Sequence, residues 1–293
     1  MNKSTRVILS AILGLLLMSG CVRKSGDANS LQIKGSDTMV NLGQAWAEEY
    51  MKQNPGTSIA VTGGGSGTGI TALINGTCDI AEVSREMKQS EIDLIASKGT
   101  APRKIIVALD GLAVVVNPAN KISELTLDQL ADIFTGKIKN WKDVGGRDAK
   151  IVLLSREVNS GTHVYFKEHV LRHGQADGKQ EFAAEALLLS SSQAIADEVS
   201  QNQDAIGYYG MGYITAKEKA LKVAKDKNSP FEAPTMENVI SGAYPISRPL
   251  LMYTKGEPQG LAKSVIDFVL SSAGQQVVQK LDFVPVNPPA QSK

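Results

Sequence analysis

The chain has 293 residues, of which 42% are hydrophobic and 21% are charged, with a formal net charge of +1 at pH 7. This length is sufficient for two lobes that each bury a core. A near-neutral surface argues against a nucleic-acid-binding protein, so any attraction for an anion has to be local to a site.

The first twenty residues have the pattern of a secretion signal. A basic end precedes an apolar run from Val7 to Met18, which is too short to cross a bilayer of about 30 Å. Ser19-Gly20-Cys21 follows and resembles a bacterial lipobox, with Met18 where that pattern prefers Leu. We expect a lipoprotein signal peptide over residues 1–20, lipidation of Cys21 and a flexible tether over residues 21–29. An ordinary cleaved signal peptide with a chance cysteine is the alternative.

Strand-like and helical segments then alternate through the first hundred residues. The expected strands cover 31–34, 57–62 and 79–84, and the expected helices cover 38–53, 70–75 and 89–98. Apolar residues at helical spacing support the first helix, namely Met39, Leu42, Trp46 and Tyr50. This alternation favours an α/β fold with a mainly parallel, doubly wound sheet.

Two β-rich runs, 104–116 and 249–253, are interpreted as strands that cross between two lobes. Residues 30–110 and 246–293 would form the first lobe, and residues 111–245 would form a second lobe inserted between them. The second lobe is expected to contain helices at 127–134, 162–173 and 191–202 and strands at 151–154 and 205–209. A helix at 260–272 would return to the first lobe.

Three loops share one design, in which a strand-like run leads through small and hydroxyl residues into a helix. They are Gly35-Ser36-Asp37-Thr38, residues 63–69 (GGGSGTG) and Ser160-Gly161-Thr162. The first backbone N–H groups of a helix are unpaired and carry a partial positive charge, and glycine allows a ligand to come close. Three such loops indicate one shared site for an oxyanion.

Two arginines stand at predicted strand ends near these loops. Arg156 lies four residues before Ser160, and Arg85 follows the third expected strand. A guanidinium makes paired, charge-assisted contacts to oxyanions, so both are candidate ligands. The alternative for each is a surface ion pair, with Glu157 or Glu86 as the partner.

Two aspartates need an explanation in an anion site. Asp37 would repel a fully ionised oxyanion, but it would be tolerated as an acceptor for a ligand proton or as a helix cap. Asp110 lies in an apolar run, so its carboxylate needs a buried partner, for which an arginine of the site is one candidate.

The motifs for enzymes are incomplete. The glycine loop matches neither nucleotide-binding pattern, and Thr68 stands where a nucleophile elbow needs glycine. The three histidines, His163, His169 and His173, lack the glutamate of a zinc-protease motif, and Ser160 with His163 lacks a third orienting group. We therefore expect no catalytic residue, no metal site and no cofactor.

Six motifs in order along the chain resemble one known family, the phosphate-binding proteins of bacterial ABC phosphate importers. They are Gly35–Thr38, Gly63–Ile70, Asp79–Arg85, Asp110–Pro118, Ile133–Trp141 and Arg156–Thr162. The resemblance runs from about Leu31 to Val286. It implies a two-lobe periplasmic-binding-protein-like fold with two hinge strands, which closes on one phosphate.

The resemblance also implies a set of phosphate ligands. Thr38 and the N–H of Met39 match the first phosphate loop of the family and Ser66 matches the second. The third is matched by Arg156, Ser160, Gly161 and Thr162. The loop residues Ser36, Asp37 and Gly67 and the strand-end Arg85 complete the predicted site.

Two positions depart from one well-known branch of the family. That branch has an aspartate where Arg85 stands, which accepts the phosphate proton, and another where Val158 stands. Discrimination against sulfate would therefore depend on Asp37. We expect a monomer outside the cytoplasmic membrane, held by the lipid on Cys21, and the resemblance implies that it passes phosphate to a membrane permease. The alternatives are a binding protein for sulfate or molybdate, a phosphatase-like hydrolase using Ser66 or Ser160, and a sensor or adhesin on the same fold.

Overall fold

The structure is a computed structural model, and it describes residues 29–175 and 177–286. The predicted signal peptide, Cys21 and the tether up to residue 28 lie outside the described residues. Within the described ranges, none of the helices combines the length and the apolar character that a membrane span requires.

A nine-stranded mixed sheet runs through the whole molecule in the order β2-β1-β3-β11-β4-β8-β6-β7, with β9 paired to β4. Its strands are β1 (Ser30–Gly35), β2 (Ser58–Thr62), β3 (Ile80–Val83), β4 (Pro102–Val116), β6 (Val152–Arg156), β7 (Leu187–Leu189), β8 (Ala205–Gly210), β9 (Lys219–Ala220) and β11 (Ser247–Lys255). A separate two-stranded sheet pairs β5 (Glu124–Thr126) with β10 (Lys222–Ala224).

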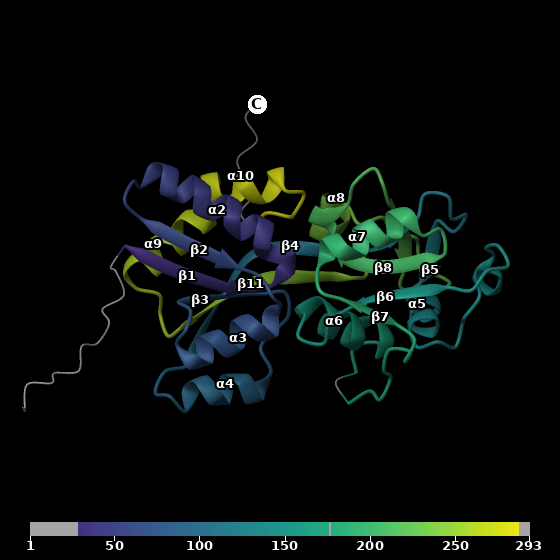
Figure 1. Ribbon diagram of the computed structural model, residues 1–293, viewed down its shortest axis with the longest axis horizontal. Coiled ribbons are helices and arrows are strands. Elements are labelled where there is room, and N and C mark those ends of the chain that lie inside the picture. Colours follow the sequence, from purple (N-terminus) through teal and green to yellow (C-terminus); the bar gives the residue numbers. More distant parts are fainter. Residues whose placement is uncertain (1–28, 176, 287–293) are drawn as a thin grey trace, which may run out of the picture.

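Helices cover both faces of the sheet in each lobe (Figure 1). In the first lobe they are α2 (Val40–Gln53), α9 (Gly260–Leu270) and α10 (Ser272–Lys280) on one face, and α3 (Ser66–Asn75) and α4 (Gln89–Ala96) on the other. In the second lobe they are α5 (Leu127–Phe134), α6 (Gly161–Phe166), α7 (Ser192–Gln201) and α8 (Met236–Ile240). Short turns are η1 (Asp37–Met39), η2 (Trp141–Val144), η4 (Met211–Tyr213) and the π-helical η3 (Lys167–Leu171).

The two long strands β4 and β11 connect the lobes. The N-terminal half of β4 pairs antiparallel with β11, and the C-terminal half, from Leu112 to Val116, pairs with β8 of the second lobe. β11 in turn pairs with β3 of the first lobe through residues 251–254. The parallel pairs β1-β2, β1-β3, β6-β7 and β6-β8 build the rest of each lobe. The two hinge strands therefore lie where the β-rich runs predicted them.

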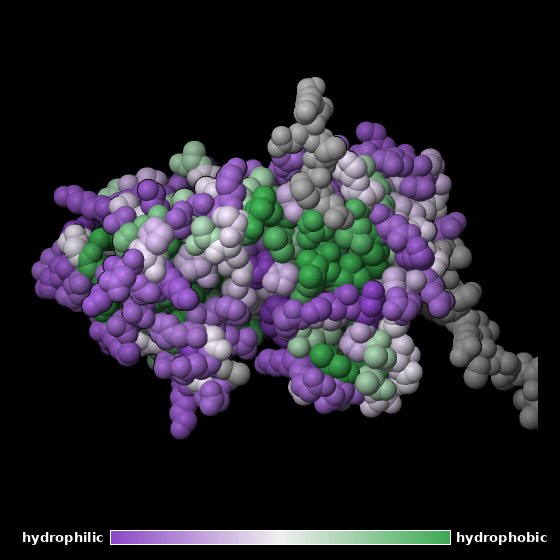
Figure 2. Space-filling view, turned by 180° about the vertical axis from the view of Figure 1, so that it is seen from behind, coloured by the Kyte–Doolittle hydropathy of each residue, from purple (hydrophilic) through white to green (hydrophobic). Residues whose placement is uncertain are grey.

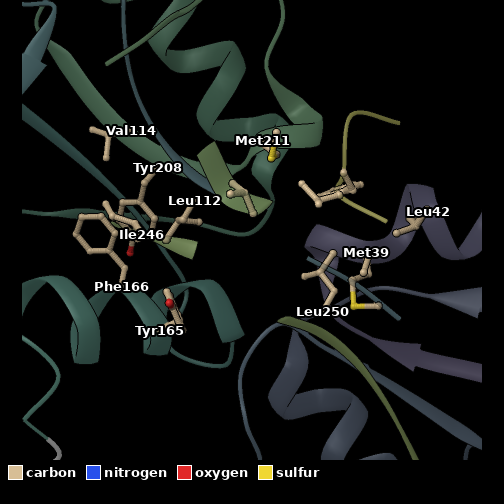
Figure 3. Close-up of a cluster of buried hydrophobic side chains, with 14 of the residues drawn as sticks. Met39, Leu42, Leu112, Val114, Tyr165, Phe166, Tyr208, Met211, Ile246 and Leu250 are labelled. Atoms are coloured by element: carbon tan, nitrogen blue, oxygen red, sulfur yellow. The ribbon is translucent and has the colours of Figure 1, made fainter. Parts of the chain in front are cut away.

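The largest core cluster extends from the first lobe to the second (Figure 3). Met39, Leu42 and Leu250 lie on the first-lobe side, while Phe166 and Tyr208 stack at 3.8 Å between ring centroids on the other. The start of α2 and the end of β8 pack in this apolar cluster. Buried side chains of both lobes therefore support the loops at the junction of the lobes.

Several element boundaries differ from the sequence prediction. α3 begins at Ser66, four residues earlier than expected, because glycines inside a helix do not prevent it when it is packed. The predicted helix at 162–173 is an α-helix of six residues followed by a π-helical turn. The helix expected at 260–272 is two helices that meet at Ser271, which caps the second.

Seen from behind, the surface is hydrophilic over most of the second lobe, and a broad apolar area lies on the first lobe beside the junction of the two (Figure 2).

A carboxyl group is buried inside the first lobe, on β3. Glu82 is 1% exposed, its Oε1 has no hydrogen-bond partner among the described residues, and Gly43 of α2 packs directly on it. Burial raises the pKa of Glu82 to about 8. The folded protein therefore keeps this group protonated at pH values where the unfolded chain releases the proton.

This burial predicts a pH-dependent stability difference between the protein and its Glu82→Gln variant. The unfolded carboxyl ionises near pH 4.5 and the folded one near pH 8. The wild-type protein should therefore lose stability relative to the variant as pH rises between these values, by the order of 3 kcal/mol at pH 7. Urea unfolding of both proteins at pH 4.5, 6 and 7.5 measures this. Parallel profiles across that range would contradict it.

Candidate functional site

The three loops singled out in the sequence meet between the lobes. The first follows β1 and the second follows β2, both in the first lobe, while the third joins β6 to α6 in the second lobe. Thr38 Oγ1 and Thr162 Oγ1 are 2.9 Å apart across the junction. Asn159 donates from Nδ2 to the carbonyl of Gly64 at 2.8 Å, and its own carbonyl accepts from the N–H of Gly67 at 2.9 Å. These bonds describe a closed arrangement of the two lobes.

Serine hydroxyls line the first-lobe side of the junction. Ser36 Oγ donates to Ser84 Oγ at 3.0 Å, and Ser66 Oγ lies 3.3 Å from the same atom. Ser66 Oγ also accepts from the N–H of Ser84 at 3.0 Å. All three residues are almost fully buried. Hydroxyls donate or accept by rotation, so this group adapts to the oxygens of an anion.

Gly161 allows the second lobe to come very close to these serines. A Cβ atom at this position would lie 2.3 Å from Ser66 Oγ and 2.7 Å from Ser84 Oγ. Gly161 and Thr162 form the first turn of α6, whose N–H groups have no partner within the helix. Ser160 caps this helix, because its Oγ accepts from the N–H of His163. The absence of a side chain thus brings the start of α6 against the start of α3.

Arg156 is buried at the end of β6 with an exposed fraction of 1%. Its Nη1 lies 3.0 Å from Asp37 Oδ2 of the other lobe and donates to Ser192 Oγ at 3.0 Å. Its Nε and Nη2 donate to the carbonyls of Leu189 and Ser190. Burial lowers the pKa of this guanidinium, and the charge of Asp37 opposes that shift. These bonds leave one N–H of Nη2 for another acceptor.

Asp37 fills one of the two roles that the sequence left open for it, that of a helix cap, and also pairs with an arginine. Its Oδ2 accepts from the N–H and the hydroxyl of Ser192 at 2.8 and 2.9 Å, so it caps α7 of the other lobe and not its own helix. The same oxygen pairs with Arg156. Val158, where a well-known branch has an aspartate, is 69% exposed. The carboxylate that pairs with Arg156 therefore comes from Asp37 of the first lobe.

Arg85 is placed apart from this group. Its guanidinium donates to both carboxylate oxygens of Glu91, at 2.8 and 2.7 Å, and to the carbonyl of Glu86 at 2.7 Å. Glu91 lies in the first turn of α4, and its carboxylate also accepts from the N–H of Lys88. This bond holds the carboxylate in position for Arg85. The structure thus shows a pair with Glu91 where the sequence suggested Glu86 as the alternative partner.

The second guanidinium of the site comes instead from Arg248 on the hinge strand β11. It donates from Nε and Nη2 to Asp110 Oδ2 at 2.9 and 2.8 Å and from Nη1 to the carbonyl of Ser84 at 3.1 Å. Its Nη2 lies 3.5 Å from Thr38 Oγ1. Sequence reasoning found Asp110 and its need for a partner but missed Arg248. The signal was a single arginine in an apolar strand that pairs with the strand of Asp110.

The Asp110–Arg248 pair is completely buried, and it fixes β11 against β4 at the point where both cross between the lobes. Burial raises the pKa of the Asp110 carboxyl, and Arg248 and the N–H of Met211 act in the opposite direction.

We expect Arg248→Met to leave the Asp110 charge buried without a partner. Loss of one member of a buried pair removes about 3–5 kcal/mol of stability. The double variant Asp110→Leu/Arg248→Met, which buries no charge, should recover most of this loss. Chemical unfolding of the three proteins gives the values. Equal stability of the single and the double variant would show that the pair does not act as a unit.

His163 does not act on Ser160 in this arrangement. Its Nδ1 lies 3.3 Å from Ser155 Oγ, and its ring packs on Phe182. Burial lowers the pKa of His163 to about 4, so the ring is neutral at neutral pH. Among the described residues, no group of three or more His, Cys, Asp or Glu side chains is arranged to hold a metal ion.

Comparison with known proteins agrees with this geometry. A family model described as a PBP superfamily domain matches residues 23–273. The phosphate-binding protein PstS of Pseudomonas aeruginosa is 35% identical over 281 residues, covering 90% of this chain and 85% of that protein. PstS of Bacillus subtilis is 36% identical over 263 residues, covering 88% of this chain and 81% of that protein.

The chain belongs to the PstS family of phosphate-binding proteins. This confirms the family that the order of the motifs along the sequence predicted.

Solved structures extend the agreement to the fold of the PstS family. A substrate-binding protein of a phosphate ABC transporter from Clostridium perfringens, solved with bound phosphate, has a TM-score of 0.79 and 35% identity. The match covers 88% of this chain and 100% of the C. perfringens chain. A phosphate transport receptor from Vibrio cholerae has a TM-score of 0.70 and 32% identity. The match covers 87% of this chain and 99% of the V. cholerae chain. The predicted two-lobe, periplasmic-binding-protein-like fold is therefore confirmed.

Proposed function

We propose that this protein binds inorganic phosphate outside the cytoplasmic membrane and delivers it to an ABC transporter for import. The observation that carries the proposal is the junction of the three loops, where hydroxyls and helix starts from both lobes meet around two buried arginines. The family supports it, because the P. aeruginosa and B. subtilis relatives are named phosphate-binding proteins and the C. perfringens structure holds phosphate.

The ligand set that we propose comes from all three loops. It comprises the hydroxyls of Ser36, Thr38, Ser66, Ser160 and Thr162, the N–H groups of Met39, Gly67, Gly161 and Thr162, and the guanidinium of Arg156. In the structure, the N–H of Met39 donates to the Ser36 carbonyl at 3.1 Å and that of Gly67 to Asn159. These two donors would have to be shared with phosphate. We add Ser84, which bonds to Ser66, and Arg248, which bonds to Ser84, and we do not include Arg85 in the set.

The charges of the site are balanced before any anion enters. Arg156 is matched by Asp37 and Arg248 by Asp110, at 3.0 and 2.8 Å. An incoming phosphate would therefore be held by hydroxyls, N–H groups and the remaining guanidinium N–H groups rather than by a net positive charge. Such bonds are strong where water is excluded, because the local dielectric is low. Thr38 and Thr162 now bond to each other and would each turn to a phosphate oxygen.

Asp37 is the group that would distinguish phosphate from sulfate. Its Oδ2 is used by Ser192 and Arg156, while its Oδ1 accepts no hydrogen bond from the residues that the structure describes. Oδ1 is thus a candidate acceptor for the proton of a phosphate ion. Sulfate carries no proton at neutral pH and would meet repulsion there.

The two alternative functions, binding of an oxyanion other than phosphate and hydrolysis, have less support. The relatives and structures above are named for phosphate. For hydrolysis, Ser160 acts as a helix cap, and the His163 ring lies against Ser155. The family is one of solute-binding proteins, and we propose that this chain has no catalytic activity of its own.

The remaining expectations from the sequence extend this proposal. We propose that Cys21 carries a lipid that holds the protein at a bacterial membrane, that residues 30–110 with 246–293 and residues 111–245 are the two lobes, and that the protein acts as a monomer beside its permease. Lipidation is tested by mass spectrometry of the protein and of its Cys21→Ser variant.

Calorimetric titration of the chain without its first 21 residues tests phosphate binding. Phosphate should bind at micromolar concentration or below with one site per chain, and sulfate should bind at least about a hundred times more weakly. The Asp37→Asn variant should narrow that difference. Tight binding of sulfate or molybdate with no response to phosphate would refute the proposal.

A further inference from the structure

One residue at the junction of the lobes, Asn159, contacts the opposite lobe without belonging to the proposed ligand set. Its side chain donates from Nδ2 to the carbonyl oxygen of Gly64 at 2.8 Å, and its own carbonyl oxygen accepts from the N–H of Gly67 at 2.9 Å. Asn159 belongs to the second lobe, and both glycines belong to the glycine loop of the first lobe, residues 63–69. Two hydrogen bonds of a single residue thus join the lobes.

A tight turn of the second lobe presents Asn159 to the glycine loop. The turn runs from Glu157 to Ser160 and is closed by a hydrogen bond of 2.9 Å from the N–H of Ser160 to the carbonyl of Glu157. The N–H of Glu157 donates to the carbonyl of Leu189 on β7, which ties the turn to the sheet. Because the backbone around Asn159 is held in this way, its side chain loses little conformational freedom when it bonds to Gly64.

The glycine loop leaves room for this contact. Gly65 has a φ angle of +100°, a backbone conformation that favours glycine. A Cβ atom at Gly65 would lie 2.8 Å from the carbonyl oxygen of Asn159, and one at Gly67 would lie 3.2 Å from the same oxygen. Two glycines of the loop therefore allow the close approach of the second lobe, in addition to the approach of a ligand that the sequence pattern indicated.

The acceptor of the Asn159 side chain is itself held in place. The carbonyl of Gly64 also accepts from the hydroxyl of Thr68 at 2.8 Å. The N–H of the next residue, Gly65, donates to the carbonyl of Gly35 at the first loop, also at 2.8 Å. Asn159 therefore bonds to a part of the first lobe that is fixed to two of the three loops, and this bond must break before the lobes can separate.

The bond lies at the outer rim of the junction. Asn159 is exposed, whereas the proposed ligands beside it, Ser66, Ser160 and Thr162, are buried with exposed fractions of 0%, 3% and 0%. Opening and closing of segments over a site often set the rate at which a bound molecule leaves. A bond at this rim is therefore placed to control the separation of the lobes around an ion that the buried groups hold.

We propose that Asn159 is a positioning residue that keeps the lobes closed over bound phosphate and so lengthens the time for which phosphate stays bound. Phosphate meets the separated lobes, and the bond from Asn159 to Gly64 forms as they come together, so the bond acts on release and not on the first encounter. This inference rests on the proposed function, because the junction must take phosphate for its release to be controlled.

Two substitutions of Asn159 and one of its neighbour test this role. Asn159→Ala removes the donor, and Asn159→Asp keeps the size of the side chain but places a carboxylate oxygen against the Gly64 carbonyl. Val158→Ala is the matched control, because Val158 lies in the same turn and is 69% exposed. We expect phosphate to dissociate about three- to tenfold faster from Asn159→Ala, faster still from Asn159→Asp, and at the wild-type rate from Val158→Ala. The association rate of Asn159→Ala should stay within about twofold of the wild-type rate.

Phosphorus NMR of the exchange between free and bound phosphate gives the dissociation rate, and calorimetry gives the dissociation constant, so the association rate follows from the two. The role of Asn159 alone is refuted if Asn159→Ala releases phosphate at the wild-type rate, if Val158→Ala accelerates release equally, or if only association changes. A wild-type protein that does not bind phosphate refutes the proposed function itself.

The unaltered protein provides a test that does not depend on the folding of a variant. The side-chain amide hydrogens of Asn159 exchange with water, and NMR follows this exchange with and without phosphate. Because the bond to Gly64 protects one of these hydrogens, we expect exchange to slow when phosphate is added. An exchange rate that phosphate leaves unchanged would overturn the proposed action of Asn159 on release.

Discussion

Replacement of Arg156 by alanine should abolish tight phosphate binding and leave the fold intact. The guanidinium is 1% exposed and connects β6, Ser192 and Asp37 across the junction of the lobes. Its loss removes a charge-assisted donor of about 1.5–3 kcal/mol and leaves Asp37 without its partner beside the anion. We expect the dissociation constant to rise by about 100-fold or more, since 1.4 kcal/mol corresponds to tenfold.

Titration calorimetry with phosphate measures this loss, and a thermal melt without ligand checks the fold. Arg147→Ala is the matched control, because Arg147 is also an arginine of the second lobe that pairs with an aspartate, Asp204, but it is half exposed. Arg156→Lys should fall between the two, since lysine keeps the charge and loses the fork. Near-normal affinity in Arg156→Ala would remove Arg156 from the site.

Replacement of Gly161 by alanine should prevent the lobes from closing. The added Cβ would lie 2.3 Å from Ser66 Oγ and 2.7 Å from Ser84 Oγ, and both serines belong to the opposite lobe. Carbon and oxygen atoms that are not bonded do not approach so closely, so the second lobe must move outward. Because the phosphate ligands that we propose come from both lobes, we expect the affinity to fall by about 100-fold while the stability of the ligand-free protein changes little.

Gly63→Ala in the second loop is the control for this variant. A Cβ atom there would find its nearest neighbour, Val40, at 3.6 Å, which is an ordinary contact. Calorimetry should show a near wild-type affinity of the Gly63→Ala variant for phosphate. Small-angle scattering in the presence of phosphate should show that the Gly161→Ala variant is more open than the wild-type protein. If Gly161→Ala binds phosphate within threefold of the wild-type protein, the closed arrangement described above is not the binding form.

The three loops and the two hinge strands could be predicted from the sequence. Glycine and hydroxyl residues between a strand-like run and a helical one mark the loops at Gly35, Gly63 and Ser160, and their order along the chain is that of a known family. The two β-rich runs predicted the hinge strands, and in the run 104–116 the internal Asp110-Gly111 indicated a bend or crossing.

The pairing of charges across the lobes could not be predicted in the same way. Arg85 and Arg156 look alike in the sequence, since each ends a strand. Their difference depends on Glu91, which caps α4 and pairs with Arg85, and on Asp37 of the first lobe, which pairs with Arg156 of the second. Arg248 was missed because its partner, Asp110, lies 138 residues away on the neighbouring strand. Contacts of this kind are set by tertiary packing, and local patterns carry no record of them.

A crystal structure of the protein with bound phosphate decides whether the three loops form the phosphate site. We expect one phosphate ion enclosed between Thr38, Ser66 and Thr162, within hydrogen-bond distance of Arg156, with the Asp37–Arg156 and Asp110–Arg248 pairs retained. A phosphate ion held elsewhere with these loops apart, or one bound at full occupancy by Arg85 in place of Arg156, would contradict it.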